Sequence, residues 1–409
     1  MMPRYAFLHV ADLRLDAPFA GVGRTPPPIA AALRDASLQA WDALVETAIG
    51  RRVAAVLLSG GLCDGLERGA RAQVRLRAGV ARLVEHGIAV FIAVGSRDPQ
   101  DGLAALGDWP EGVVVFTPGR AAAVPLRRDG QTLAVVHGVG VDPEEGADAA
   151  ARRIVRGDAP GPHLALLPSA FDRGGVSLDV LRAAGVDYWA LGGGAEFAVH
   201  HAYDPWVVTP GTPQARALQD HGAHGAALVE VEDGTVARVT LEPLDRVRSL
   251  AVRIDDADDA VALQQRLHDA AMGLRAAHSE HVLVLSALVG SRAGVARVVR
   301  LPETRATVLA ALRRDAERTD ARLWWAALRA APPGPLAAAA DDLAGEVARR
   351  RALLSADAER TIQFVQRRFE PLRGTWTAAL DPRDVDPLLD EAAAVAVDAL
   401  VAGEDDAGR

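Results

Sequence analysis

The sequence predicts an α/β protein in which helices cover both faces of its sheets. Over roughly the first 240 residues, short apolar runs alternate with segments of helical periodicity. The apolar runs have the length of strands and are unbroken by polar residues, which is typical of strands buried on both faces. Beyond residue 245 the same alternation returns on a smaller scale. Alternation of this kind indicates layers of sheet and helix.

The elements of the first part follow one another closely. A helix is expected after Pro26, because proline favours the first helical turn, and its apolar side chains recur at helical spacing as far as Ile49. The pair Asp233-Gly234 predicts a hairpin turn between two strands. Further helices are expected at 67–86 and 175–182. The expected strands lie at 7–11, 53–58, 88–94, 113–116, 132–137, 164–167, 226–231 and 235–241, with another starting at Tyr188.

The second part reads as a small β-α-β-α-β unit followed by helices. Its strands are expected at 249–255, 281–287 and 322–330, with helices at 257–274 and 303–316. A Pro-Pro-Gly-Pro stretch then breaks the chain, and helices are expected at 343–365 and 385–401. The predicted domains are 1–245, a small α/β domain at 246–331, a C-terminal helical segment at 337–402 and a disordered acidic tail at 403–409.

Composition narrows the class of protein. No apolar run approaches the roughly 20 residues of a membrane span, and no signal peptide is visible. A single cysteine, Cys63, excludes a disulfide framework within the chain. We therefore expect a cytoplasmic protein with no membrane role. The formal net charge of −9 argues against a free-standing DNA binder, because phosphate neutralisation usually requires a basic excess.

Four of the expected strands end in short polar or glycine-rich loops. The loops read Asp12-Leu13-Arg14, Gly60-Gly61-Leu62-Cys63-Asp64, Gly95-Ser96-Arg97-Asp98 and Gly192-Gly193-Gly194-Ala195. In order and spacing they resemble the DxH, GDxxD, GNHD and GHIH motifs of the calcineurin-like metallophosphoesterases. Within that group the chain resembles the SbcD-type DNA repair exonucleases and their YhaO-like relatives. The segment Pro210-Gly211-Thr212-Pro213-Gln214 is also similar to these families.

The resemblance covers residues 1–245 with some specificity and implies a two-sheet sandwich flanked by helices. Beyond residue 245 only the order of domains is similar to the family. There the resemblance implies a small α/β cap domain at 246–331 and C-terminal helices that dock on a partner. Active members of the family use two manganese ions. They dimerise through the phosphoesterase domain and work with an SMC-like coiled-coil ATPase in DNA end processing. The resemblance thus implies a homodimer, such an ATPase as partner, and DNA contacted through the complex.

The metal ligands of the family are mostly replaced in this chain. Two-metal hydrolysis needs a bridging carboxylate and N or O donors around each ion. Asp12 persists, but Gly61 stands at the bridging position and offers no side chain. Arg14 and Arg97 replace histidines, and a guanidinium has no lone pair to donate. Ser96 replaces an asparagine, while Pro168, Gly193 and Ala195 replace histidines. The sequence predicts no catalytic residue, no metal site and no cofactor.

What remains is predicted to be a vestigial pocket. Its residues are Asp12, Arg14, Gly61, Asp64, Ser96, Arg97, Asp98, Gly193 and Ala195. One hypothesis is that the guanidinium groups of Arg14 and Arg97 replace the metal cations and neutralise the leftover carboxylates. The alternative is that the same two arginines bind an anion such as phosphate. Asp64 and Asp98 are expected to cap loops or form ion pairs.

Other polar residues receive structural interpretations. His137 is expected to be a hydrogen-bonded core or loop residue. His200 and His201 are adjacent on a strand and therefore face opposite sides, so they cannot easily share an ion. His221 and His224 are expected to be solvent-exposed, and Cys63 to be a small buried thiol.

The leading functional hypothesis is a non-catalytic scaffold or regulatory subunit resembling the nuclease subunit of SbcCD-type complexes. Two alternatives stay open. The chain could be a residual metal-dependent DNA exonuclease or phosphoesterase that uses Asp12 with other ligands. It could also be a binding module that senses phosphate or nucleotides through an arginine-lined pocket.

Overall fold

The computed structural model divides the chain into two compact units, which are described separately. The first comprises Met1–Leu250 with His278–Val284, and the second Ala251–Ala277 with Leu285–Arg409. The described residues are 3–62, 70–96, 98, 109–142, 144–171, 175–290, 295–330, 343–368, 385, 386, 388, 389, 392 and 393. The predicted tail at 403–409 lies outside them, and the boundaries at 245, 331 and 337 stay predictions.

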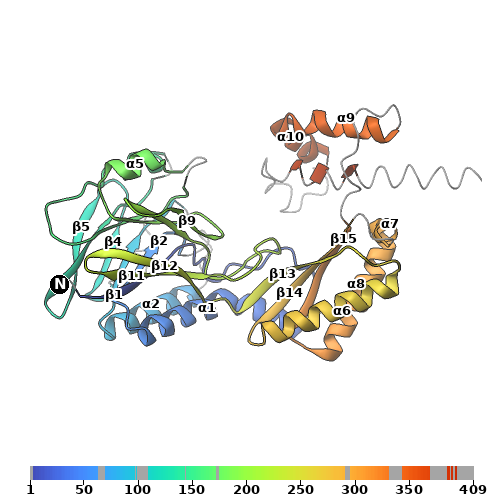
Figure 1. Cartoon of the computed structure of the whole chain (residues 1–409), viewed down its shortest axis with the longest axis horizontal. Helices are drawn as coiled ribbons and strands as arrows, with labels where there is room; N and C mark the ends of the chain where they lie inside the picture. The colour runs from blue at the N-terminus through green and yellow to red at the C-terminus, as the bar shows by residue number, and fades with distance from the viewer. Residues whose placement is uncertain are drawn as a thin grey trace, which may run out of the picture. The chain divides into compact units, whose positions relative to one another are not determined.

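Two six-stranded sheets form the first unit (Figure 1). One sheet runs in the order β12-β11-β1-β2-β3-β4, with β1, β2, β3 and β4 parallel and β11 and β12 antiparallel to their neighbours. Its strands are β1 (Tyr5–Val10), β2 (Ala55–Ser59), β3 (Ala89–Ala93), β4 (Val113–Phe116), β11 (Gly225–Glu232) and β12 (Thr235–Pro243).

The second sheet has a parallel centre and antiparallel edges. It runs β5-β6-β7-β8-β10-β9, with β6, β7, β8 and β10 parallel. The edge strands β5 and β9 pair antiparallel with β6 and β10. The strands are β5 (Ala122–Arg128), β6 (Gln131–Gly138), β7 (His163–Leu167), β8 (Tyr188–Leu191), β9 (Phe197–His201) and β10 (Trp206–Pro210).

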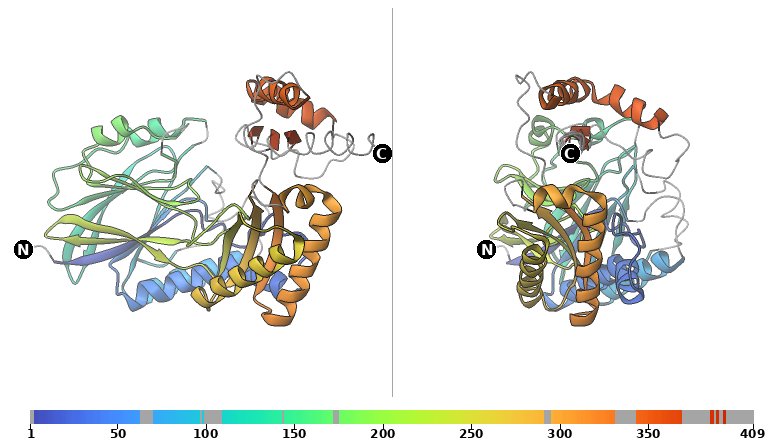
Figure 2. Two further views of the ribbon diagram at one scale, coloured as in Figure 1. Left: turned by 45° about the vertical axis from the view of Figure 1, so that its right-hand side comes forward. Right: turned by 90° about the vertical axis from the view of Figure 1, so that its right-hand side faces the viewer.

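The two sheets face each other across one apolar core. Phe7, Leu57 and Phe91 of the first sheet lie in the same buried cluster as Leu166 and Tyr188 of the second. Helices cover the outer faces: α1 (Pro27–Gly50) and α2 (Ala70–Glu85) pack on the first sheet, and α4 (Ala147–Ala151) and α5 (Leu178–Ala183) on the second. Figure 2 shows α1 and α2 in blue and α5 in green on opposite sides of the strands. The predicted α/β sandwich is confirmed.

Local sequence explains how several of these elements begin and turn. Helix α1 starts with proline at its first positions, as predicted, since the missing N–H would be unpaired there in any case. Between β11 and β12, Asp233 and Gly234 have φ values of +48° and +79°, which give the two-residue turn that the sequence predicted. Gly79 of α2 lies against the Trp41 indole of α1, so close that a Cβ there would be 2.3 Å from the ring nitrogen.

The second unit contains most of a three-stranded sheet in the order β13-β14-β15. The strands are β13 (Val247–Ile254), β14 (Val282–Val289) and β15 (Leu323–Ala330), and the helices are α6 (Ala260–Ala277), α7 (Ala296–Arg300), α8 (Pro302–Thr319), α9 (Leu343–Ser355) and α10 (Ala358–Arg368). Helix α8 contacts both β15 and α6. No helix in the described part of the chain is long and apolar enough to cross a membrane.

One predicted C-terminal helix is two helices in the structure. The sequence indicated a single helix over 343–365, but α9 ends at Ser355 and α10 begins at Ala358. The carboxylate of Asp357 accepts a hydrogen bond from the Arg360 N–H at 3.1 Å and so caps a new helix start. Of the helix predicted at 385–401, only residues 385, 386, 388, 389, 392 and 393 are described, and these are helical.

Candidate functional site

A pocket of about 610 Å³ opens where the carboxyl ends of strands from both sheets meet. Asp12 follows β1, Gly61 follows β2, Ser96 follows β3 and Gly193 follows β8. Because β1, β2 and β3 are parallel, the loops at their ends converge at one edge of the sheet. The pocket is lined by Asp12, Arg14, Ser59, Gly60, Gly61, Gly95, Ser96, Val141, Asp142, Gly146, Ala147, Pro168, Ser169, Ala170, Gly193, Gly194, Ala195, Thr212 and Arg216.

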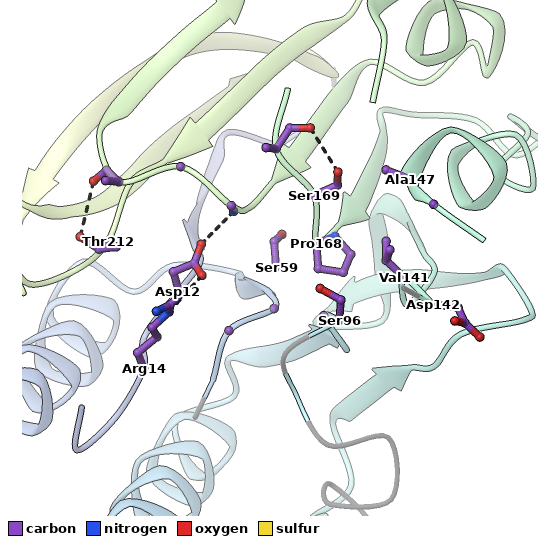
Figure 3. A pocket seen from close by; sticks show the side chains of 18 of the residues that line it. Asp12, Arg14, Ser59, Ser96, Val141, Asp142, Ala147, Pro168, Ser169 and Thr212 are labelled. Carbon is purple, nitrogen blue, oxygen red and sulfur yellow. Dashed lines mark hydrogen bonds and ion pairs between the residues drawn. The ribbon is translucent and has the colours of Figure 1, made fainter. Parts of the chain in front are cut away.

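The structure brings most of the predicted site residues together. Asp12, Arg14, Gly61, Ser96, Gly193 and Ala195 all line this pocket, as does Pro168 (Figure 3). Asp98 is buried and lies next to the pocket wall, where it accepts a hydrogen bond from Gly61 N–H. Asp64, Arg97 and Cys63 lie outside the described residues, so the predictions made for them stay predictions.

The Asp12 carboxylate is held by its own chain. Its Oδ2 accepts a hydrogen bond from the Gly193 N–H at 2.8 Å, and its Oδ1 lies 3.7 Å from Arg14 Nε. Burial raises the pKa of Asp12, while the Gly193 hydrogen bond and the charges of Arg14 and Arg216 oppose that rise. Figure 3 shows the Asp12 carboxylate beside the Arg14 guanidinium. The Arg14–Asp12 part of the hypothesised ion-pair cluster is therefore present.

The backbone around Asp12 is closely packed against the loop after β2. Asp12 N–H donates to the Gly60 carbonyl at 2.9 Å, and Arg14 N–H donates to the Gly61 carbonyl at 2.8 Å. Gly61 has a φ of +67°, and a Cβ there would lie 2.5 Å from Asp12 Oδ1 and 2.8 Å from Asp12 Cα. No side chain fits at this position without moving one of the loops. The space that a bridging carboxylate needs is filled by Asp12.

The position of a lost histidine is similarly occupied. Gly193 has a φ of +74°, and a Cβ on it would lie 2.8 Å from the Ala170 nitrogen. Within the described residues, no group of three or more His, Cys, Asp or Glu side chains is placed to hold a metal ion. Asp12 persists at a metal-ligand position of the family, and it is already engaged by a backbone donor and a cation. The residues of this pocket that the structure describes do not fit a centre of two metal ions.

Asp98 connects the two loops that flank this pocket. Its carboxylate accepts hydrogen bonds from the backbone N–H groups of Gly61 and Leu62, both at 2.8 Å, and of Gly95 at 2.9 Å. The residue is only 3% exposed. A buried carboxylate that accepts several N–H bonds supplies much of the order of the backbone around it. Asp98 thus has the loop-capping geometry that the sequence suggested.

The sequence did not predict two charged residues of the pocket. Arg216 and Asp142 both line it, and the positive charge of Arg216 acts on Asp12. The Arg216 backbone is fixed because its N–H and that of Ala217 donate to the Asp220 carboxylate at 2.9 and 3.0 Å. In the sequence, Arg216 is marked by its position as a basic residue shortly after the proline-rich segment Pro210–Gln214.

Two buried histidines lie on different faces of the sheets: His9 lies between the two sheets, whereas His137 lies on the outer face of the second sheet. His9 Nε2 donates to the Leu191 carbonyl at 2.9 Å, which leaves Nδ1 to accept from the Tyr188 hydroxyl at 2.9 Å. His137 contacts His163 through ring nitrogens 2.8 Å apart, so its interpretation as a hydrogen-bonded core residue is confirmed. Burial lowers the pKa of His9 to about 3 and that of His137 to about 4.

The lowered histidine pKa values predict a loss of stability in acid. Their folded pKa values lie below the ordinary value of 6.5, so the unfolded chain binds more protons as the pH falls below that value. The free energy of unfolding is therefore expected to fall by about 1.4 kcal/mol per pH unit for His9 between roughly pH 6 and 4. Urea titrations across this range measure the slope. In His9→Gln the slope is expected to be shallower, whereas the exposed control His221→Ala keeps it; equal slopes in all three proteins would contradict the assignment.

None of the four other candidate histidines lines the pocket. His200 Nε2 lies 2.9 Å from Thr209 Oγ1, and His201 Nδ1 donates to the Pro205 carbonyl at 2.8 Å. The two adjacent side chains thus have different partners, in keeping with their opposite faces. His221 is exposed as predicted. The prediction of exposure was wrong for His224, which is 4% exposed because it bonds Thr212 through Nδ1 at 3.0 Å.

The loops that resemble the metallophosphoesterase motifs converge at this pocket. No protein-family model matches it. It is 30% identical over 284 residues to the uncharacterized metallophosphoesterase YhaO of Bacillus subtilis (strain 168), an alignment that covers 67% of this chain and 69% of YhaO. The chain therefore belongs to the metallophosphoesterase family, as a YhaO-like member. A dimetal phosphatase from Danio rerio is similar in structure at a TM-score of 0.35, with 12% identity, over 56% of this chain and 93% of that chain.

Proposed function

We propose that this chain is a metallophosphoesterase-like protein without two-metal catalysis that serves as a scaffold or regulatory subunit. The observation that supports this most strongly is the packing of Gly61 on Asp12. It leaves no room for the carboxylate that joins two metal ions, while Arg14 supplies a fixed positive charge in the same pocket. Restoring a centre would require several ligands and a rearranged loop together, since even supporting partners of a metal site typically contribute 10–100-fold to affinity or activity.

The proposed setting is a DNA end-processing complex of the SbcCD type. In this setting the chain forms a homodimer, pairs with an SMC-like coiled-coil ATPase, and contacts DNA through the complex. Apolar side chains on the C-terminal helices support a docking role, because Leu353 of α9 and Phe364 of α10 are exposed. Helix α10 also carries polar residues on the rest of its surface, as amphipathic docking helices do. Because the chain has a net charge of −9, we expect its partner rather than the chain itself to make most of the contacts with DNA.

A second candidate function, phosphate or nucleotide sensing, is favoured by the arginines of the pocket. Arg14 and Arg216 both line it, and guanidinium groups bind phosphate oxygens in a bidentate manner. The carboxylates of Asp12 and Asp142 offset these charges. For that reason we place sensing behind the scaffold role. The alternative of a residual nuclease would require Asp12 to bind a metal ion together with ligands that the sequence does not predict.

The catalytic part of the proposal is tested with the full chain, manganese and labelled double-stranded DNA. We expect no cleavage above the metal-free blank, because the pocket lacks the donors for two ions. A chromogenic phosphodiester in parallel covers small substrates. Asp12→Asn is the matched control for trace contamination, since any genuine activity of this pocket would depend on Asp12. Manganese-dependent cleavage that disappears in Asp12→Asn would refute the non-catalytic role.

The docking part is tested by co-purification with an SMC-like ATPase of the same organism. The double variant Leu353→Glu and Phe364→Glu is expected to lose the partner while the unfolding midpoint stays close to that of the wild type, because both side chains are exposed. Val74→Glu, an exposed apolar residue on α2, is the matched control and is expected to retain the ATPase. Absence of any complex with the wild-type chain would count against this partner.

A further inference from the structure

A second hollow, of about 470 Å³, lies at the opposite end of the parallel strands from the pocket. It is lined by Ile49, Gly50, Arg52, His86, Ile88 and Arg128. Ile49 and Gly50 end helix α1, whereas His86 and Ile88 lie between α2 and β3. The pocket lies after the carboxyl ends of β1, β2 and β3. The residues of the hollow at the ends of α1 and α2 come before β2 and β3. The two sites are therefore separated by the length of the strands.

The hollow collects cationic and donor side chains from three separate elements. Arg52 follows α1, His86 follows α2, and Arg128 ends β5. No carboxylate lines the hollow, and within the described residues none of these three side chains is paired with an acid. Like charges gathered in one concave site repel one another and favour an anion between them. This arrangement contrasts with the rest of a chain whose net charge is −9.

Hydrogen bonds fix the orientation of two of these groups. Arg128 donates from a terminal guanidinium nitrogen to the Arg52 carbonyl at 3.2 Å, which holds it beside the hollow. His86 Nδ1 donates to the Arg82 carbonyl at 2.8 Å, which leaves Nε2 for another partner; Nε2 is an N–H donor in the imidazolium form of the ring. Both groups are thus oriented before any ligand arrives, which reduces the entropy that binding would cost.

Arg52 occupies a backbone position that glycine would satisfy better. Its φ is +52°, and the Val53 N–H closes the end of α1 on the Ala48 carbonyl at 3.1 Å. Helix α2 ends in the same way, but with Gly87 at the equivalent position and a φ of +71°. A residue with a Cβ is strained in this conformation, whereas glycine is not. A cation near the C-terminus of a helix stabilises that helix, but this effect does not account for the arginines of the hollow. Arg51 already places a cation after α1, and Arg128 belongs to a strand.

From this geometry we infer a phosphate-binding site formed by Arg52, His86 and Arg128. The ligand class is a phosphate ester: the two guanidinium groups and the Nε2–H of the His86 imidazolium donate to its oxygens, and Ile49 and Ile88 provide an apolar wall. This site does not use the Asp12 pocket and holds whether or not the chain is catalytic. The phosphate belongs either to a small phosphoester or to a nucleic-acid backbone, and the two probes below separate these sources.

The decisive variant is Arg52→Gly, because it removes the cation while relieving the backbone. Binding of inorganic pyrophosphate to the full chain is measured by calorimetry, and binding of a labelled single-stranded oligothymidylate by fluorescence anisotropy. We expect Arg52→Gly and Arg128→Gln each to weaken binding about tenfold or more. Arg127→Gln, an exposed neighbour that does not line the hollow, is the matched control and is expected to bind within about twofold of the wild type.

Urea unfolding of the same variants separates binding from folding. Arg52→Gly is expected to be at least as stable as the wild type, so weaker binding cannot be attributed to a damaged fold. Pyrophosphate binding sensitive to the variants identifies a small phosphoester, and oligothymidylate binding alone identifies a nucleic-acid backbone; either result supports the site. Three results would overturn it: no binding of either probe by the wild type, undiminished binding in Arg52→Gly and Arg128→Gln, or equal weakening in Arg127→Gln.

Discussion

Replacing Asp98 by alanine is expected to lower the free energy of unfolding by about 3–5 kcal/mol, a large effect for a single substitution. The reason is that three backbone N–H groups, those of Gly61, Leu62 and Gly95, lose their shared acceptor at once. Each buried donor left unsatisfied costs roughly 1–3 kcal/mol, and partial access of water reduces the sum. Urea denaturation followed by circular dichroism measures the change.

Two further variants show whether the carboxylate itself is responsible. The side chain of Asp98→Asn keeps one acceptor oxygen, but its NH2 group is a donor that faces backbone N–H donors. Most of the loss in the free energy of unfolding is therefore expected to remain. Glu144→Ala removes an exposed carboxylate near the pocket and is expected to change the stability by less than about 0.5 kcal/mol. If Asp98→Ala were no less stable than Glu144→Ala, the loops would not depend on this cap.

Reintroducing a bridging carboxylate with Gly61→Asp is expected to damage the fold and to leave metal binding unrestored. The new Cβ would meet Asp12 at 2.5 Å in a backbone conformation with φ of +67°, and a second carboxylate would lie beside a half-buried one. We expect a loss of about 3 kcal/mol or more from the overlap, the backbone strain and the charge repulsion together. Thermal and urea unfolding measure the loss, and manganese titration tests the site.

Gly23 offers a matched control for this substitution. Its φ is +66°, almost the same as that of Gly61, but a Cβ there would meet no atom within 4 Å. Gly23→Asp therefore carries the backbone cost alone, about 1 kcal/mol. The difference between the two variants isolates the contact with Asp12. Equal stability of Gly61→Asp and Gly23→Asp, or tight manganese binding by the former, would show that the loop opens readily.

The sequence predicted the layering and the convergence of the polar loops for clear physical reasons. Unbroken apolar runs such as β2 and β3 have few alternatives to a buried parallel sheet, and the carboxyl ends of parallel strands necessarily share one edge. Asp12, Gly61 and Ser96 follow three neighbouring strands, so their meeting in one pocket was predictable. The turn at Asp233-Gly234 was predictable because few other dipeptides adopt positive φ so readily.

The sequence was less informative where irregular loops decide which residues meet. Burial of His224 depends on Thr212 and on the Asp220 carbonyl, which lie in the same connection between β10 and β11. The contribution of Arg216 to the pocket depends on a turn that Asp220 stabilises. The hollow around Arg52 combines two helix ends with a strand, and no local pattern connects them. Residues separated in the chain but joined through loops give no periodic signal.

The central claim, that this pocket cannot hold two catalytic metal ions, is tested most directly by counting bound manganese. The full chain is equilibrated with excess manganese, freed of unbound metal by gel filtration, and examined by elemental analysis together with Asp12→Asn. The account predicts well below one manganese ion per chain, and the same value for wild type and variant, because Asp12 is already held by Gly193 and Arg14. Two manganese ions per wild-type chain, lost in Asp12→Asn, would contradict it.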